Sequence, residues 1–267
     1  MSQRFSLIAT RFVMLVASAA LVGACASSSQ SGKAKPLAAA DYAVILADPA
    51  RSEADKKDDA ARKPAEVLAF AQIAPGDTVL EMEGGVGWYS EIIAAAVGPA
   101  GKLIAQYPPE FSYGEAPYKA RVAAGRLKNA VITVTHFDNL QAPDASVDKV
   151  LWILGPHELY YTPKNAQPGV LGDVQKTYAE IVRVLKPGGV FIAMDHAANA
   201  SAPTSTGHDL HRIDPAVVLA SAKAAGLQYI DKSDVLANPT EDRSKMVFEA
   251  GVRRHTDQFL FRFRKPK

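Results

Sequence analysis

Two kinds of segment alternate along most of the chain: short apolar runs, and longer stretches whose apolar residues lie three or four positions apart. The first kind predicts buried strands and the second amphipathic helices. The run over 147–155 is almost unbroken, as a central strand of a parallel sheet requires. In the last run Phe259, Phe261 and Phe263 alternate with polar residues, which predicts a half-buried or edge strand. The expected strands are 78–82, 101–107, 130–138, 147–155, 189–196, 227–235 and 258–266, and the expected helices are 64–73, 88–98, 117–129, 170–188 and 214–226.

This alternation predicts an α/β fold: a doubly wound, Rossmann-like, mostly parallel sheet with an antiparallel C-terminal strand. Ligands of such sheets bind beyond the carboxyl ends of the strands, near the point where the strand order reverses. Polar residues at the predicted strand ends are therefore the candidates for a site. They are Glu81, Glu83, Gln106, Asp138, His157 and His196.

Composition narrows the classes of partner. The chain has 267 residues, of which 48% are hydrophobic and 22% charged, enough for one sizeable core. The net charge is +2 and no long basic run is present, so no nucleic acid partner is expected. A single cysteine excludes an internal disulfide.

A glycine-rich stretch, "VLEMEGGVGWYSEII" over 79–93, follows the first predicted strand. Such loops let a cofactor approach bare backbone, but Glu83 occupies the place of the usual first glycine. A dinucleotide would bring its anionic pyrophosphate to this loop, where a glutamate would repel it. Glu83 therefore disfavours NAD more than a cationic cofactor, unless its side chain simply points to water.

Three stretches in order resemble the class I S-adenosylmethionine-dependent methyltransferases: the glycine loop, "VTHFDNLQAPDASVDKVLWI" and "VLKPGG". More narrowly, "RKPAEVLAF", "GPAGKLIAQ", "LHRID" and "DQFLFRFRKP" resemble a bacterial group of exported, uncharacterised predicted methyltransferases. The resemblance implies S-adenosyl-L-methionine as cofactor. It places Glu81 near the methionine part, Gln106 at the ribose in place of the usual acidic residue, and Asp138 at the adenine. The implied cofactor-binding set is Glu81, Glu83, Gly84, Gly85, Gly87, Gln106, Asp138 and Asn139.

Histidines supply the candidate catalytic groups. His157 and Glu158 fall just after the predicted strand over 147–155, and His196 ends the one over 189–196 on the same rim. The two histidines are expected to face one cleft, and either could act as a base near neutral pH. The alternative is that each imidazole satisfies a loop or a buried carbonyl. In "HDLHRID", His208 and His211 lie three residues apart, but no third ligand is visible, so no metal is expected.

The N-terminal segment differs from the rest of the chain. Arg4 and Arg11 precede an apolar run that ends in small residues at Cys25, a pattern typical of an export signal. The ending "LVGAC" resembles a bacterial lipobox, in which the cysteine is lipid-modified; an ordinary secretory signal is the alternative. Because Ala26 follows, with no aspartate, the resemblance implies a lipoprotein on the periplasmic side of the outer membrane. The expected organisation is a signal peptide over 1–25, a flexible tether over 26–40, and a single methyltransferase-like domain with an N-terminal helical extension over 41–267.

Two functions from different classes fit these features. The first is a methyltransferase acting on a small or lipid-associated acceptor, with a lipid anchor as its membrane contact. The alternative is a non-catalytic envelope binding protein on a methyltransferase scaffold, which export and Glu83 would favour. A third reading is a different enzyme that uses the same cleft with the pair of His157 and His196.

Cys25→Ser tests the lipobox. We expect the variant to lose maturation at residue 25 and membrane association, because the thiol is the atom that carries the lipid. Fractionation of cells and the mass of the mature N-terminus measure both. Unchanged maturation and membrane association would contradict the lipobox interpretation.

Overall fold

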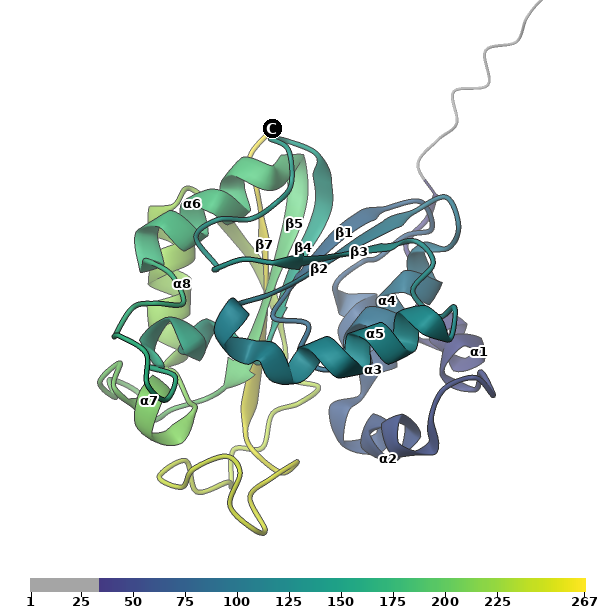
Figure 1. The fold of residues 1–267 in the computed structure, drawn as a ribbon. Coiled ribbons are helices and arrows are strands. Elements are labelled where there is room, and N and C mark those ends of the chain that lie inside the picture. Colours follow the sequence, from purple (N-terminus) through teal and green to yellow (C-terminus); the bar gives the residue numbers. More distant parts are fainter. Residues whose placement is uncertain (1–33) are drawn as a thin grey trace, which may run out of the picture. The chain divides into compact units, whose positions relative to one another are not determined.

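A seven-stranded sheet is the centre of the computed structural model, which describes residues 34–267 (Figure 1). The strand order is β3-β2-β1-β4-β5-β7-β6. Pairing is parallel from β3 to β5, and β7 runs antiparallel to both of its neighbours. The strands are β1 (Thr78–Met82), β2 (Lys102–Tyr107), β3 (Ala130–Val134), β4 (Val147–Ile153), β5 (Leu185–His196), β6 (Gln228–Ser233) and β7 (Gln258–Arg264).

Helices cover both faces of the sheet (Figure 1). All five predicted helices and all seven predicted strands are present, with bounds that differ by a few residues, so the predicted fold class is confirmed. The α-helices are α1 (Tyr42–Leu46), α2 (Glu53–Arg62), α3 (Pro64–Phe70), α4 (Trp88–Val97), α5 (Glu115–Ala123), α6 (Val174–Val184), α7 (Thr206–Leu210) and α8 (Pro215–Ala224). The short 3-10 helices are η1 (Ala39–Asp41), η2 (Pro109–Gly114) and η3 (Pro156–Tyr160).

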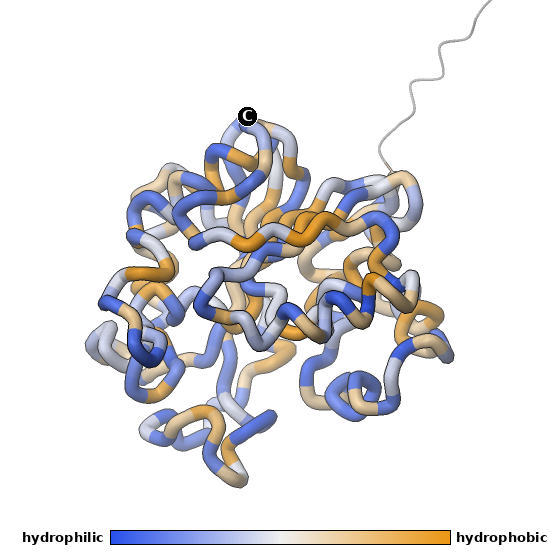
Figure 2. Tube along the Cα trace, viewed as in Figure 1, coloured by the Kyte–Doolittle hydropathy of each residue, from blue (hydrophilic) through white to orange (hydrophobic). Residues whose placement is uncertain are grey.

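The core has two halves because side chains alternate across each strand. On one face, Leu80 and Trp152 pack in a cluster that includes residues of α6 and α8. On the other face, Val79 and Leu151 pack in a cluster that includes residues of α3, α4 and α5. Figure 2 shows the hydrophobic residues concentrated along the strands and the inner sides of the helices. The central strands are therefore covered on both sides.

The order of the strands reverses at β1, which pairs with β2 on one side and β4 on the other. The glycine loop leaves the carboxyl end of β1 at this reversal, where doubly wound sheets bind their ligands. Two segments outside the regular alternation lie near this edge: α2 and the loop over 234–257. Arg254 of this loop forms hydrogen bonds of 3.0 and 2.5 Å with the Asp58 carboxylate of α2.

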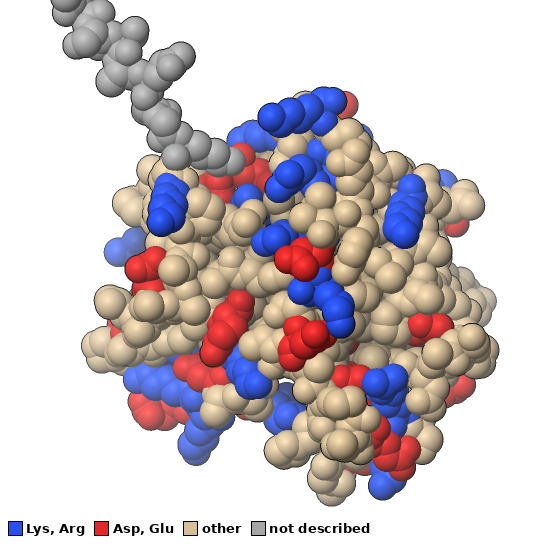
Figure 3. Space-filling view, turned by 180° about the vertical axis from the view of Figure 1, so that it is seen from behind, with Lys and Arg blue, Asp and Glu red and all other residues tan. Residues whose placement is uncertain are grey.

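Charged side chains of both signs are interspersed on the face seen in Figure 3. Within residues 34–267, no helix is long and apolar enough to cross a membrane. The predicted signal peptide, and Cys25 with it, lies outside the described residues.

Candidate active site

A cavity lies at the carboxyl ends of β1, β4 and β5, in two pockets that share one wall. The loop pocket, of about 270 Å³, borders the glycine loop and is lined by Glu81, Glu83, Gly85 and His157 among others. The α2 pocket, of about 400 Å³, borders helix α2 and the 234–257 loop. The shared wall consists of Arg62, Val86, Trp88, Tyr89, Leu154, His196, Val247 and Phe248. Together the two pockets reach the size of small-molecule sites.

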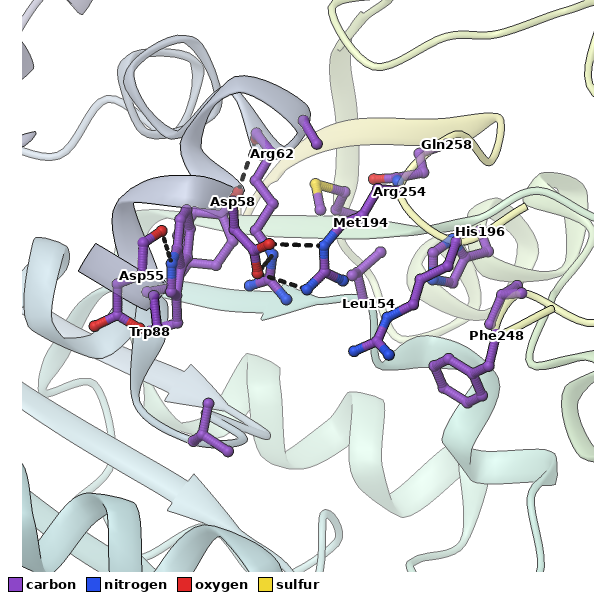
Figure 4. A pocket seen from close by; sticks show the side chains of 16 residues that line it. Asp55, Asp58, Arg62, Trp88, Leu154, Met194, His196, Phe248, Arg254 and Gln258 are labelled. Atoms are coloured by element: carbon purple, nitrogen blue, oxygen red, sulfur yellow. Dashed lines mark hydrogen bonds and ion pairs between the residues drawn. The ribbon is translucent and has the colours of Figure 1, made fainter. Parts of the chain in front are cut away.

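Figure 4 shows the α2 pocket between α2 and the C-terminal half of the chain. The Arg62 guanidinium lies over the Trp88 ring, 4.6 Å from its centroid, and the indole nitrogen donates to the Asp55 carbonyl at 3.0 Å. On the opposite side Leu154, Met194 and Phe248 lie among the polar side chains of His196, Arg254 and Gln258. The pocket thus combines apolar and charged side chains on its C-terminal side.

The three predicted glycines of the loop have different structural roles. A side chain on Gly84 would overlap the Tyr118 hydroxyl, and one on Gly87 would press against Arg121. These two glycines therefore allow α5 to pack against the loop. Gly85 has φ +56°, and a side chain there would meet only the Glu83 carbonyl, at 4.0 Å. Gly85 lines the loop pocket and has open space at its side-chain position.

Glu83 adopts the left-handed conformation, with φ 54°, that the usual glycine would adopt without strain. Its N–H donates to the Gln106 side-chain oxygen at 3.2 Å, which helps to hold the turn. Its carboxyl group is turned inward. Burial, and then the nearby Glu158 carboxylate, raise the pKa of Glu83 well above its ordinary value. The possibility that Glu83 simply points to water is therefore wrong.

Glu81 is buried below the loop, with 3% of its surface exposed. Its carboxyl oxygen accepts a 2.5 Å hydrogen bond from the Ser90 hydroxyl, which lies 2.6 Å from the Tyr118 hydroxyl. Burial raises the pKa of Glu81 to about 7, although the Ser90 hydrogen bond acts in the opposite direction. Near neutral pH this group is therefore poised between its acid and its carboxylate.

His157 is the centre of a buried polar cluster. Its Nδ1 lies 2.9 Å from one Asp195 carboxylate oxygen, and its backbone N–H donates to the other at 2.7 Å. On the other side of the ring, Nε2 lies 3.1 Å from His211 Nδ1 and 3.2 Å from Glu158 Oε1. Burial lowers the pKa of His157, but Asp195 and Glu158 outweigh it and raise the pKa well above its ordinary value.

His196, the other predicted catalytic residue, lines the same cavity. Its ring centroid is 6.5 Å from that of His157, and its Nδ1 lies 2.7 Å from the Thr256 hydroxyl. Burial, and then the charge of His157, lower the pKa of His196 well below its ordinary value. The two histidines therefore share one cavity in different protonation states, while their catalytic roles stay a prediction.

The residues predicted to contact the adenosine part of the cofactor lie outside the two pockets. Gln106 is fully buried, and its amide donates to the Thr135 carbonyl while accepting from Glu83. The Asp138 carboxylate accepts from the Asp173 N–H at 3.1 Å, and Asn139 is exposed. Gln106, Asp138 and Asn139 line neither pocket. Their contacts with a cofactor stay a prediction.

Several residues of the cavity carried no clear signal in the sequence. Phe248 and Arg254 come from the irregular 234–257 loop, and Arg62 from the predicted extension. His211 comes from the "HDLHRID" segment. Of these segments, only "HDLHRID" has residue types, two histidines and two aspartates, that could have marked it as part of a site.

No family model matches the chain. It is 27% identical over 193 residues to the ubiquinone/menaquinone biosynthesis C-methyltransferase UbiE of Hydrogenovibrio crunogenus, across 69% of this chain and 68% of that protein. It is 31% identical over 132 residues to the demethylmenaquinone methyltransferase of Symbiobacterium thermophilum, across 49% and 47%. It is 28% identical over 136 residues to the arsenite methyltransferase of Halobacterium salinarum, across 51% and 31%. The chain thus spans about two thirds of the first relative and less than half of the other two.

Solved structures share the fold over most of the chain. A SAM-dependent methyltransferase from Aquifex aeolicus matches with a TM-score of 0.55 at 18% identity, across 85% of this chain and 98% of that one. The chain has the class I methyltransferase fold. The [4+2]-cyclase SpnF matches with a TM-score of 0.58 at 17% identity, across 88% and 99%. A phosphoethanolamine N-methyltransferase of Haemonchus contortus, in complex with S-adenosyl-L-methionine, matches at 0.55 and 12%, across 77% and 53%.

Gln106→Glu tests whether this side chain holds the glycine loop. The substitution removes the amide donor and places a carboxylate oxygen against the Thr135 carbonyl in a fully buried position. We expect the free energy of unfolding to fall by at least about 2 kcal/mol. Denaturant unfolding measures it, with the exposed Gln141→Glu as the matched control, expected within about 0.5 kcal/mol of wild type. A stable Gln106→Glu variant would contradict the structural role.

Glu81→Gln tests the raised pKa. The folded pKa of about 7 lies above the ordinary 4.5, so the stability that Glu81 contributes is fully present below pH 4.5. That stability is lost as the pH rises to about 7. We expect the unfolding free energy of wild type to fall by roughly 3 kcal/mol more than that of Glu81→Gln over this range.

Chemical denaturation at a series of pH values measures the difference between the two proteins. Ser90→Ala removes the hydrogen bond that lowers the pKa of Glu81, so the pKa of Glu81 should rise further. The fall in unfolding free energy should then extend to higher pH. Parallel curves for wild type and Glu81→Gln would show that the carboxyl group titrates normally.

Proposed function

We propose that the protein is an S-adenosylmethionine-dependent methyltransferase acting on a small or lipid-associated acceptor. One observation carries the proposal. At the reversal point of a class I methyltransferase sheet, Gly85, with open space at its side-chain position, lines a cavity together with Glu81 and Glu83. The relation to curated methyltransferases over more than half of the chain supports it.

The charge of the cavity suits this cofactor. S-adenosylmethionine carries an ammonium and a sulfonium, and when bound it supplies an activated methyl group to an acceptor nucleophile. Glu81 and Glu83 would hold it beside Gly85, because a bound cation favours the carboxylate form of acids whose pKa burial has raised. A pyrophosphate would instead meet Glu83 with Glu158 close behind it. The residues present thus fit a cationic cofactor and disfavour NAD.

The neighbouring α2 pocket provides the place for an acceptor. Its apolar residues Leu154, Met194 and Phe248 suit the hydrophobic body of an acceptor, and Arg254 beside them suits a polar or anionic group of it. His196 lines both pockets, so its imidazole would lie beside an acceptor bound there and could accept a hydrogen bond from it. Two relatives are named for quinone methylation, which agrees with an acceptor of this class.

Location completes the proposal. We propose that the chain belongs to an exported bacterial group and is anchored through a lipid on Cys25 at the outer membrane, facing the periplasm. An anchor of this kind would bring the cavity close to membrane-bound acceptors. It would also require that the cofactor reaches the protein outside the cytoplasm.

Calorimetric titration of the purified full-length chain with S-adenosylmethionine and with S-adenosylhomocysteine tests the proposal. We expect both to bind with one site per chain. Gly85→Asn should weaken binding at least about tenfold, because asparagine tolerates the left-handed backbone but fills the space beside the loop.

Gly76→Asn is the matched control. Gly76 also has a positive φ, of +85°, with nothing near its side-chain position, and it lines neither pocket. We expect it to bind like wild type. Absence of binding to both compounds would end the methyltransferase proposal.

A further inference from the structure

Three potential metal ligands converge beside the loop pocket, although they come from two separate segments. His157 and Glu158 belong to η3, directly after β4, and His211 ends α7. The atoms His157 Nε2, His211 Nδ1 and Glu158 Oε1 form a triangle with sides of 3.1, 3.2 and 3.8 Å. No other such group of three is found in the described part of the chain.

The size of this triangle is that of a metal centre. A tetrahedral zinc ion binds histidine nitrogen and carboxylate oxygen at about 2.0–2.2 Å, which separates neighbouring ligand atoms by roughly 3.3–3.6 Å. We propose that His157, Glu158 and His211 bind one divalent transition-metal ion, with zinc as the best match. This site goes beyond the proposed methyl transfer and does not depend on it.

The surroundings hold the first histidine in the orientation that a ligand needs. Both oxygens of the fully buried Asp195 carboxylate lie within 3.1 Å of His157 Nδ1. A carboxylate in this position keeps the proton on Nδ1, so that a metal ion would displace only the proton on Nε2. Asp195 is therefore a positioning residue that acts through His157.

The second histidine is also fixed. His211 has a left-handed backbone, with φ 52°, as the last residue of the α7 turn. Its ring is packed between Tyr161 and Phe248, at centroid distances of 4.8 and 5.0 Å. This packing directs Nδ1 toward His157, so two of the three ligands are oriented before any ion arrives.

Charge balance points to a cation independently of distance. Glu158 and Asp195 are buried, and the carboxyl group of Glu83 is turned toward them. In the part of the chain that the structure describes, no lysine or arginine forms an ion pair with any of these three residues. The second oxygen of Glu158, Oε2, is buried with no hydrogen-bond partner. Buried carboxylates need a counter-charge; His157 can supply one positive charge, and a divalent ion would supply the remainder.

The ligand set also indicates the class of metal. Two imidazoles and one carboxylate suit zinc and its transition-metal neighbours, whereas magnesium and calcium prefer oxygen ligands alone. Because His157, Glu158 and His211 all line the loop pocket, a fourth coordination position would open into it. A catalytic zinc centre keeps three protein ligands and one such open position. An oxygen ligand bound there would have a lowered pKa.

The purified full-length chain, stripped of metal with a chelator, is titrated with Zn²⁺ by calorimetry and with Co²⁺ by visible absorption. We expect one ion per chain, with the strong absorption of four- or five-coordinate cobalt. Glu158→Gln and His211→Ala should each weaken binding more than roughly 100-fold, beyond the 10- to 100-fold cost of losing an outer partner. Asp195→Asn should fall within that smaller range.

His208→Ala is the matched control, because His208 lies one turn before His211 in α7 but contacts the Thr162 N–H instead. We expect it to bind zinc like wild type. Glu158→Gln keeps the shape of the side chain and remains informative if His211→Ala does not fold. No stoichiometric binding by wild type, or equal binding by Glu158→Gln, would overturn the proposal. Either result would leave the titration with S-adenosylmethionine unaffected, so the two proposals fail separately.

Discussion

The burial of three carboxyl groups at one edge of the sheet is the constraint on which the site depends. Glu83, Glu158 and Asp195 follow or end β1, β4 and β5, which are neighbours in the sheet. Buried like charges raise the free energy of the folded state unless a proton, an imidazolium or a bound cation compensates them. His157 lies between Asp195 and Glu158 and compensates part of this charge. The remaining negative charge would favour cationic groups in the cavity.

The glycine loop is held by its neighbours more than by its own sequence. Arg121 of α5 donates to the Val86 carbonyl at 2.9 Å and pairs with both Asp55 and Glu91, so it ties the loop to α2 and α4. Gln106 holds the turn from the side of β2. A loop fixed in this way keeps the open side of Gly85 in place without a bound ligand, which lowers the ordering cost of binding.

The fold could be predicted because its signals are local. Apolar runs and helical periodicity place each element, and the short connections leave one topology. The site could be predicted only in part. Strand ends identified Glu81, Glu83, His157 and His196, since position along a parallel strand fixes the edge. Gln106 has the same position, yet its side chain bonds to Thr135, a contact that depends on the register between β2 and β3. Sequence spacing carries no information about such a contact.

The proposed metal ligands could not be predicted from their spacing in the sequence, because they too come together only through tertiary packing. His208 and His211 are close in the sequence, but His211 meets His157 and Glu158 only because α7 packs on η3. Gly207 permits this packing, since any side chain there would collide with the His157 carbonyl. A residue with no side-chain chemistry therefore brings the ligands together.

Because the ligands line the loop pocket, a metal ion and a cationic cofactor would both lie there and repel each other. Each is therefore expected to weaken the binding of the other.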